Sequence, residues 1–328
     1  MARYILKRVL YMIPVTIGVV FLIYSLMCLI PGNPVQLILG LGSEVSQDEI
    51  DALTEELGLN DPFIVRFANY LKGIITKFDF GKSYSTRKPV MKEIMERFPY
   101  TFKLAVLSII LSVFLGVLTG IIAATKQYSI FDGLATTLAL LGVSMPIFWL
   151  ALMLILIFSI NLNLFPVSGS YGFEYWVLPV ATVGLNGAAN IMRTTRSSML
   201  ETIRQDYIRT ARAKGQTEIK IIFNHALKNA LIPVITVIGM QFGGILGDTV
   251  ISETVFAIPG IGKYTIDAIM KRDQPVVMGS IMFLSFCVSV INLIVDVLYS
   301  FIDPRIKTLY KTSNEKKGLA KEVSTTNE

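Results

Sequence analysis

The sequence predicts an all-α protein that crosses a membrane several times. Of its 328 residues, 53% are hydrophobic and only 16% are charged, well below the quarter or so that is usual in soluble domains. The mean hydropathy is +0.59. Uninterrupted apolar runs of about 20 residues recur along the chain, and each is long enough to cross roughly 30 Å of hydrocarbon as a helix.

Six apolar runs are predicted to be transmembrane helices. They cover residues 9–30, 100–124, 131–160, 176–198, 229–252 and 277–302. The first run has no small-residue cleavage site and is too long for the core of a signal peptide, so we expect it to be retained. The third run contains Pro146, whose missing backbone donor predicts a kink.

The distribution of Lys and Arg predicts that both termini are cytoplasmic. Positively charged side chains occur before the first run, between the second and third, and after the last: Arg3, Lys7, Arg8, Lys126, Arg305, Lys307 and Lys311. The connection 161–175, which would lie on the opposite side, has no Lys or Arg.

Residues 31–99, between the first two spans, are expected to form a small extracytoplasmic helical cap attached to the first span, residues 1–30. Ser46 and Glu49 form a capping box at the start of "SQDEIDALTEELGL". The apolar positions of this stretch are Ile50, Leu53 and Leu57. A second amphipathic stretch, "RFANYLKGIIT", follows. Residues 306–328 are polar and are expected to be a disordered cytoplasmic tail.

A basic segment, "DYIRTARAKGQTEIKIIFNHALKN", separates the fourth and fifth spans. Wound as one helix, it has one apolar or small-residue stripe: Ile208, Ala211, Gly215, Ile219, Ile222 and Ala226. Gly215 is unfavourable inside a helix, so it predicts a bend between two short helices and a close approach of the backbone to another group. The pattern alone is compatible with a helix lying on anionic lipid or with a docking element for a cytoplasmic partner.

Small residues recur every four positions in two spans. They are Ser108, Ser112, Gly116 and Gly120 in the second span, and Gly239, Gly243 and Gly247 in the fifth. Such faces let helix backbones approach closely in lipid. The pattern does not decide between packing within one subunit and contact with a second subunit.

The sixth span carries one polar face: Ser285, Ser289, Asn292, Asp296 and Ser300. An acidic residue near mid-span costs about 2.5–3.5 kcal/mol on insertion scales, so this face should avoid lipid. Asn292 and Asp296 are therefore candidates for a polar path or for a hydrogen-bonded network with neighbouring spans. We favour the network as the hypothesis.

Motifs of catalysis and nucleotide binding are absent from the sequence. "FDFGKS" resembles the end of a phosphate-binding loop, but Thr76 stands where that motif needs a glycine. No HExxH or GxSxG occurs, and the single histidine, His225, excludes a multi-histidine metal site. We expect no catalytic residue, no metal and no cofactor bound by this chain. The segment "AIPGIGKYTIDAIMKRDQPV" predicts a short helix bracketed by turns. It could be part of an outer gate, a contact with a partner, or only a structured connector.

Several motifs together resemble the permease subunits of ABC importers, specifically the dipeptide/oligopeptide/nickel family. The longest is "MRTTRSSMLETIRQDYIRTARAKGQTEIKIIFNHALKNALIPVITVIG". The others are "IPGNPV", "ELGLNDP", "FDFGKS", "SMPIFW", "FPVSG", "SETVFAIPGIGKYTIDAIMKRDQPVVMG" and "NLIVDVLYSFIDPRIK". Their order is specific to the family, and only the tail falls outside the resemblance.

The resemblance implies that residues 199–228 are a coupling loop within a core permease domain, residues 100–305. In such permeases a short helix of this loop inserts into a groove on the ATPase. Here Arg209–Gly215 would lead into a coupling helix over Gln216–Asn224. The docking residues would be Asp206, Arg209, Ala211, Arg212, Ala213, Lys214, Gly215, Ile219, Ile222 and Phe223. Importer permeases broadly carry Glu-Ala-Ala, whereas this chain has Arg209-Thr210-Ala211, which puts a salt bridge of that Glu in doubt.

The resemblance also implies a set of partners and a mechanism. The chain would be a non-catalytic translocation subunit in the cytoplasmic membrane of a prokaryote, surrounded by lipid and binding no nucleic acid. A second homologous permease, two ATPases that bind ATP and Mg, and an extracytoplasmic solute-binding protein would complete an alternating-access importer. Its solute would be peptides or a related small solute such as nickel or a metal chelate. The alternatives are a proton-coupled secondary carrier using Asp296 and a self-contained channel, but both leave the basic loop without a role.

Overall fold

The computed structural model describes residues 2–29, 35, 46–56 and 60–302 of the chain. The expected disordered tail, most of "IPGNPV" and the apolar position Leu57 lie outside the described residues. Within them the chain is helical, with one isolated β-bridge between Lys82 and Pro89. The all-α prediction is therefore confirmed for this part of the chain.

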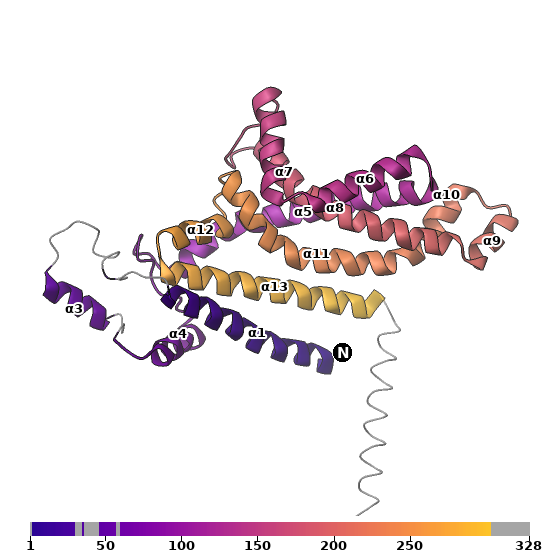
Figure 1. Ribbon diagram of the computed structural model, residues 1–328. Helices are drawn as coiled ribbons and strands as arrows, with labels where there is room; N and C mark the ends of the chain where they lie inside the picture. Colours follow the sequence, from indigo (N-terminus) through magenta and orange to yellow (C-terminus); the bar gives the residue numbers. More distant parts are fainter. Residues whose placement is uncertain (1, 30–34, 36–45, 57–59, 303–328) are drawn as a thin grey trace, which may run out of the picture. The chain divides into compact units, whose positions relative to one another are not determined.

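Figure 1 shows the helices of the described residues in chain order. They are α1 (Ala2–Leu29), α3 (Gln47–Glu56), α4 (Phe63–Lys77), α5 (Val90–Thr125), α6 (Ile130–Ser144), α7 (Ile147–Leu154), η1 (Ile155–Asn161), α8 (Glu174–Ile203), α9 (Asp206–Ala213), α10 (Glu218–Lys220), η2 (Ile221–Leu227), α11 (Lys228–Val255), α12 (Ile261–Met270) and α13 (Gln274–Ile302). The contacts group the described residues into two compact units. The first lies within residues 1–111, 144–186 and 244–289, and the second lies within residues 112–143, 187–243 and 290–302.

Four helical segments of the described chain are long and apolar enough to cross a membrane: Arg8–Leu29, Val90–Thr125, Glu218–Val255 and Gln274–Leu298. The pair α6 and α7–η1 is a fifth candidate if it counts as one span. α8 has 30 residues, long enough to span, but it does not reach the same apolarity. Its polar side chains include Asn186, Asn190, Arg193 and Arg196.

The expected third span, 131–160, is broken rather than kinked. α6 ends at Ser144, and α7 begins after Pro146 at a bend of 112°. The residue before a proline is driven out of the helical conformation, and proline lacks the donor that would continue the ladder. Pro146 has φ −59° and ψ 137°, and so it starts a new helix.

The cap after the first span is helical as predicted, with one local difference. α3 begins directly after Ser46, but the Ser46 hydroxyl accepts a hydrogen bond from the amide of Asp48, at 3.3 Å, and not from Glu49. α4 packs on α1 through an aromatic cluster in which Tyr24 lies against Phe63 and Phe67 at ring distances of 5.2 and 5.4 Å. This contact fastens the cap to the first span.

The loop between α4 and α5 is anchored by a buried carboxylate. Asp273, just before α13, accepts hydrogen bonds from the Ser83 hydroxyl at 2.6 Å and from the amides of Tyr84 and Ser85 at 3.1 and 3.0 Å. Gly81 turns the chain here with φ +82°. "FDFGKS" is thus a structural turn. α5 then starts at Val90, ten residues before the expected boundary, because its first turns pack on α12 and α13 in the same core.

The stretch between α11 and α13 contains the expected short helix, α12. Its first turn is held by side chains of neighbouring helices: the amide of Ile261 donates to Thr101 Oγ1 at 2.8 Å, and the amide of Lys263 donates to Glu253 Oε2 at 3.0 Å. The Tyr264 hydroxyl donates a hydrogen bond to Glu93 at 2.6 Å. Burial and, to a lesser extent, this hydrogen bond raise the pKa of Tyr264. α12 is therefore locked to α5 and α11 within the first unit.

Candidate functional site

The basic segment of the second unit folds as a helix, a tight turn and a second helix. α9 ends at Ala213, and Gly215 then adopts φ +74°, a left-handed conformation that favours glycine. Asp206 in the first turn of α9 lies where negative charge is favourable. The predicted bend at Gly215 is confirmed. The expected close approach is not found within the described chain, since a Cβ on Gly215 would meet nothing within 4 Å.

Side-chain hydrogen bonds across the turn fix its shape. The Arg212 guanidinium donates two hydrogen bonds to the Glu218 carboxylate, at 2.7 and 3.2 Å, and this pairing raises the pKa of Arg212. His225 Nε2 lies 2.8 Å from Gln216 Oε1. The helix before the turn and the helix after it are thereby connected directly.

The inner face of this element packs on the ends of α5 and α8. Ile208, Ala211, Ile221 and Ala226 are buried with Ile121, Ala124, Met199 and Ala230. After the turn the expected stripe is right at Ala226, which is buried, but wrong at Ile219. Ile219 is 73% exposed, whereas Ile221 is fully buried. The left-handed turn at Gly215 changes the phase of the second helix, which a continuous helical wheel cannot represent.

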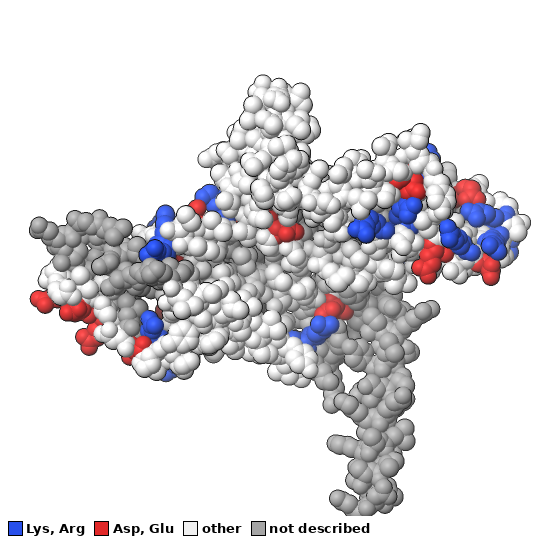
Figure 2. All heavy atoms as spheres, viewed as in Figure 1, with Lys and Arg blue, Asp and Glu red and all other residues white. Residues whose placement is uncertain are grey.

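The outer face of the element is exposed and mixed in character. Eight of the ten expected docking residues are exposed: Asp206, Arg209, Arg212, Ala213, Lys214, Gly215, Ile219 and Phe223. Ala211 is buried and Ile222 is partly buried, so Ala211 cannot contact a partner in this conformation. Figure 2 shows the charged side chains of both signs gathered over α9 and α10. Exposed Ile219 and Phe223 among these charges are typical of an interaction surface.

The short separate helix precedes Gly215 and does not follow it. The sequence placed a coupling helix over Gln216–Asn224, but the segment from Glu218 continues through η2 into α11 without a break. α9, Asp206–Ala213, is the isolated short helix. Thr217, with extended backbone angles, starts the long second helix, and no further turn residue interrupts it.

Two of the expected glycine contacts lie within the chain, between α5 and α8. A Cβ on Gly116 would stand 2.7 Å from Ile191, and a Cβ on Gly120 would stand 2.6 Å from Thr195. These distances leave no room for a side chain, so both glycines allow α5 and α8 to pack closely within the chain.

The glycines of α11 do not act as one face. Gly239 is buried, and Gly243 lies against the Asn292 side chain of α13. Gly247, by contrast, is exposed and has open space at its Cβ position. In the second unit Asn292 is exposed, apart from this contact, and Asp296 is partly buried. Their role in a path or a network stays a prediction.

Replacing Gly120 by alanine is expected to lower the free energy of unfolding by about 1–3 kcal/mol, because the added methyl group overlaps Thr195 and the backbone of Met192. Gly247→Ala is the matched control, since its methyl group meets open space. Thermal unfolding of the purified variants in one detergent measures both. Equal midpoints for the two variants would contradict close packing at Gly120.

One charged pair of the second unit was missed by sequence reasoning. Arg196 of α8 donates two hydrogen bonds to Asp132 of α6, at 2.6 and 2.8 Å. Only 6% of the Asp132 side chain and 26% of the Arg196 side chain are exposed. The residues are 64 positions apart, and both fall inside expected spans, so no local pattern indicated the pairing.

Comparison with known proteins identifies the family to which the chain belongs. Residues 116–308 match a family model described as binding-protein-dependent transport system inner membrane component, and residues 1–105 match its N-terminal counterpart. The chain is 44% identical to the dipeptide transport system permease protein DppB of Alkalihalophilus pseudofirmus, over 94% of this chain and 100% of that protein. It is 39% identical to DppB of Escherichia coli, over 94% of this chain and 99% of that protein.

Solved structures show the same fold at lower identity. The chain resembles the MetNI methionine ABC transporter in an inward-facing conformation with a TM-score of 0.51 and 16% identity, over 65% of this chain and 97% of that chain. It also resembles an amino acid ABC transporter with a TM-score of 0.50 and 15% identity, over 66% of this chain and 94% of that chain.

Proposed function

Because the chain belongs to the family of binding-protein-dependent transport system inner membrane components, we propose that it is a permease subunit of an ATP-driven importer of dipeptides or other short peptides. Family membership and the apolar helices establish a multi-pass membrane protein. Its relatives are dipeptide and peptide transport system permease proteins, which supports a short peptide as the solute. Nickel or a metal chelate is the related alternative within the wider family.

The element formed by α9, the turn at Gly215 and the start of the second helix, residues 206–227, carries the proposal through its exposed face. Its inner face is buried against α5 and α8, while Ile219 and Phe223 stay exposed beside charged residues. The Arg212–Glu218 pair fixes the shape of the surface before any partner arrives. A preformed surface of this kind suits docking into a groove on an ATPase subunit, because little conformational entropy is lost on binding.

The packing suggests how ATP-driven motion reaches the spans. A displacement of α9 presses Ile208 on Met199 of α8 and on Ile121 of α5, because all three belong to one buried cluster. The second helix of the element continues into α11, so the same push acts along that helix. Closure of the ATPases would thus change the arrangement of the spans and produce alternating access.

The remaining features of the importer belong to its other subunits. Two ATPases bind ATP and Mg, a second homologous permease completes the path, and an extracytoplasmic protein delivers the solute. This chain contributes no catalytic group and binds no cofactor. Both termini face the cytoplasm of a prokaryote. A proton-coupled carrier using Asp296 would leave the α9 surface without a role, and we do not propose it.

Co-purification tests this function. We expect the tagged chain, extracted in mild detergent, to bring along an ATPase with a phosphate-binding loop and a second six-span permease. Reconstituted with the solute-binding protein, the complex should take up a labelled dipeptide only when ATP is present on the ATPase side. If the chain purifies alone and still moves solute without ATP, the proposal is wrong.

A further inference from the structure

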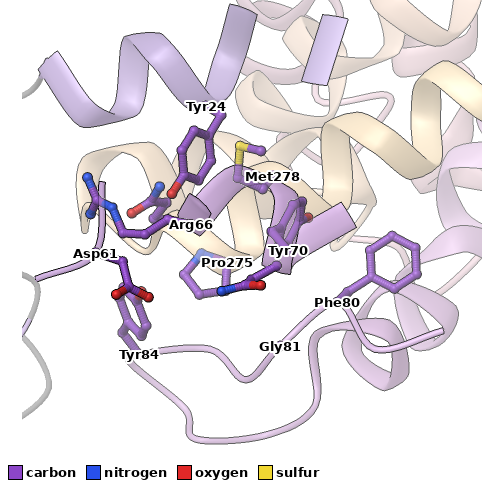
Figure 3. Close-up of a pocket in the computed structure, with 11 residues that line it drawn as sticks. Tyr24, Asp61, Arg66, Tyr70, Phe80, Gly81, Tyr84, Pro275 and Met278 are labelled. Atoms are coloured by element: carbon purple, nitrogen blue, oxygen red, sulfur yellow. The ribbon is translucent and has the colours of Figure 1, made fainter. Parts of the chain in front are cut away.

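A pocket of about 230 Å³ lies in the first unit, between α1, α4, the loop after α4 and the start of α13 (Figure 3). Its lining residues are Tyr24, Asp61, Arg66, Asn69, Tyr70, Phe80, Gly81, Tyr84, Gln274, Pro275 and Met278. In Figure 3, Arg66 and Asp61 are drawn at one end and Phe80 at the other. The pocket is separate from the α9 surface, which belongs to the second unit.

Two polar atoms of this lining are buried without a partner. Arg66 Nε and the Tyr70 hydroxyl have no hydrogen-bond partner among the described residues. A buried donor left unsatisfied costs about 1–3 kcal/mol, and such groups in a native protein call for an explanation. Each of these two groups can donate a hydrogen bond to a ligand atom that has lone pairs. A carboxylate fits best, because it accepts several hydrogen bonds and is attracted by the guanidinium.

The rest of the lining suits a positively charged group and a short apolar body. The carboxylate of Asp61 stands at the same end of the pocket as Arg66, and it can pair with an ammonium group. The pKa of Tyr84 is raised to about 12 by burial and, less, by nearby Asp273, so its hydroxyl stays protonated. Phe80, Pro275 and Met278 supply the apolar wall.

The size of the pocket limits the ligand. Sites for drug-sized molecules measure about 300–1,000 Å³, so a pocket of about 230 Å³ takes a smaller molecule or the end of a longer one. A compact zwitterion with one carboxylate, one ammonium group and small side chains matches both the volume and the polar groups.

We propose that this pocket binds a short zwitterionic peptide, whose carboxylate is held by Arg66 and Tyr70 and whose ammonium group is held by Asp61. The inference rests on the proposed function for the identity of the solute. In the orientation argued above the pocket faces the extracytoplasmic side. It would retain the peptide at the permease after the solute-binding protein releases it.

Tyr70→Phe separates ligand binding from folding. Because the hydroxyl makes no hydrogen bond in the described structure, its removal should not lower the unfolding midpoint. Arg66→Gln removes the guanidinium charge as a second variant. Tyr171→Phe and Lys72→Gln are matched controls, since both side chains are exposed and neither lines the pocket.

The test is calorimetric titration of the co-purified complex with Ala-Ala. The complex is held in phosphatidylcholine nanodiscs, without ATP and without the solute-binding protein. We expect saturable binding that weakens about tenfold in Tyr70→Phe and more in Arg66→Gln, with both controls unchanged. The Ala-Ala amide, which lacks the carboxylate, and N-acetyl-Ala-Ala, which lacks the ammonium group, should each bind more weakly.

Three outcomes overturn the inference. The first is no saturable binding of Ala-Ala to a normally folded complex, and the second is binding that both pocket variants leave unchanged. The third is saturable binding of glycerophosphoethanolamine without binding of Ala-Ala, which would identify a lipid headgroup as the occupant. If ATP-dependent dipeptide uptake persists in any of these cases, the pocket inference alone fails. If no peptide is taken up at all, the proposed function fails.

Discussion

Gly215→Pro is expected to separate the chain from its ATPase while the membrane-embedded part stays folded. Proline is restricted to φ near −65°, whereas Gly215 has φ +74°. The substitution also removes the amide that donates to the Arg212 carbonyl at 2.9 Å. A conformational penalty of about 3 kcal/mol on the docking-competent turn corresponds to a loss of about two orders of magnitude in affinity. Quantitative mass spectrometry of the co-purified ATPase, together with dipeptide uptake, measures the effect.

Two other substitutions at Gly215 test whether backbone conformation causes the loss of the ATPase. A side chain at Gly215 meets open space, so any effect is conformational and not steric. Asparagine enters the left-handed region more readily than other residues, and so Gly215→Asn should retain most of the ATPase. Gly215→Ala should be intermediate. An ATPase yield that follows side-chain volume instead of backbone preference, or a wild-type yield from the proline variant, would contradict this account.

Local residue type and spacing were sufficient to predict several helices and turns of the fold. Long apolar runs gave helices close to the expected ranges for α1, α11 and α13. Glycine's freedom at positive φ predicted the bend at Gly215, and the turn residues around α12 predicted a short bracketed helix. In each case the cause acts within a few residues of the chain, which is the range over which a sequence can be interpreted without its fold.

The sequence-based predictions were wrong where one turn changed the orientation of the helix that follows it. A single wheel over the basic segment assigned Ile219 to the buried face, but the turn at Gly215 rotated the second helix and buried Ile221. Similarly, Pro146 was expected to kink a span and instead separates two helices. The phase of a helix after a break depends on φ and ψ of two or three residues, and side-chain periodicity contains no information about those angles.

The pocket and the ion pair could not be predicted from spacing because they join distant parts of the chain. The residues that line the pocket come from α1, α4, a loop and α13. No local sequence pattern in these segments indicates that they contact one another. In the sequence, Asp132 and Arg196 lie near the ends of two different expected spans, 64 positions apart. Only the packing of α6 on α8 shows that the two charges form one pair.

Asp132→Asn is expected to lower the free energy of unfolding by about 3 kcal/mol. Breaking a buried ion pair by removing one partner leaves the other charge uncompensated, and this typically costs about 3–5 kcal/mol. We expect the lower end, since Arg196 is 26% exposed and water can solvate part of its charge. Asp132 also accepts a hydrogen bond from the amide of Tyr128 at 3.0 Å, which the asparagine carbonyl can keep. The unfolding midpoint in detergent should fall by several degrees.

A double variant and an exposed control make this result specific. Asp132→Asn combined with Arg196→Met removes both charges, and it should recover much of the lost stability because no unpaired charge remains. Asp206→Asn is the matched exposed carboxylate, 97% exposed and 3.7 Å from Arg209, and it should change the midpoint little. Equal effects of Asp132→Asn and Asp206→Asn would show that the buried pair stabilises the fold no more than the exposed pair does. Because Arg196 lies on α8 one turn before Met199, on which α9 packs, the destabilised variant should also retain less ATPase.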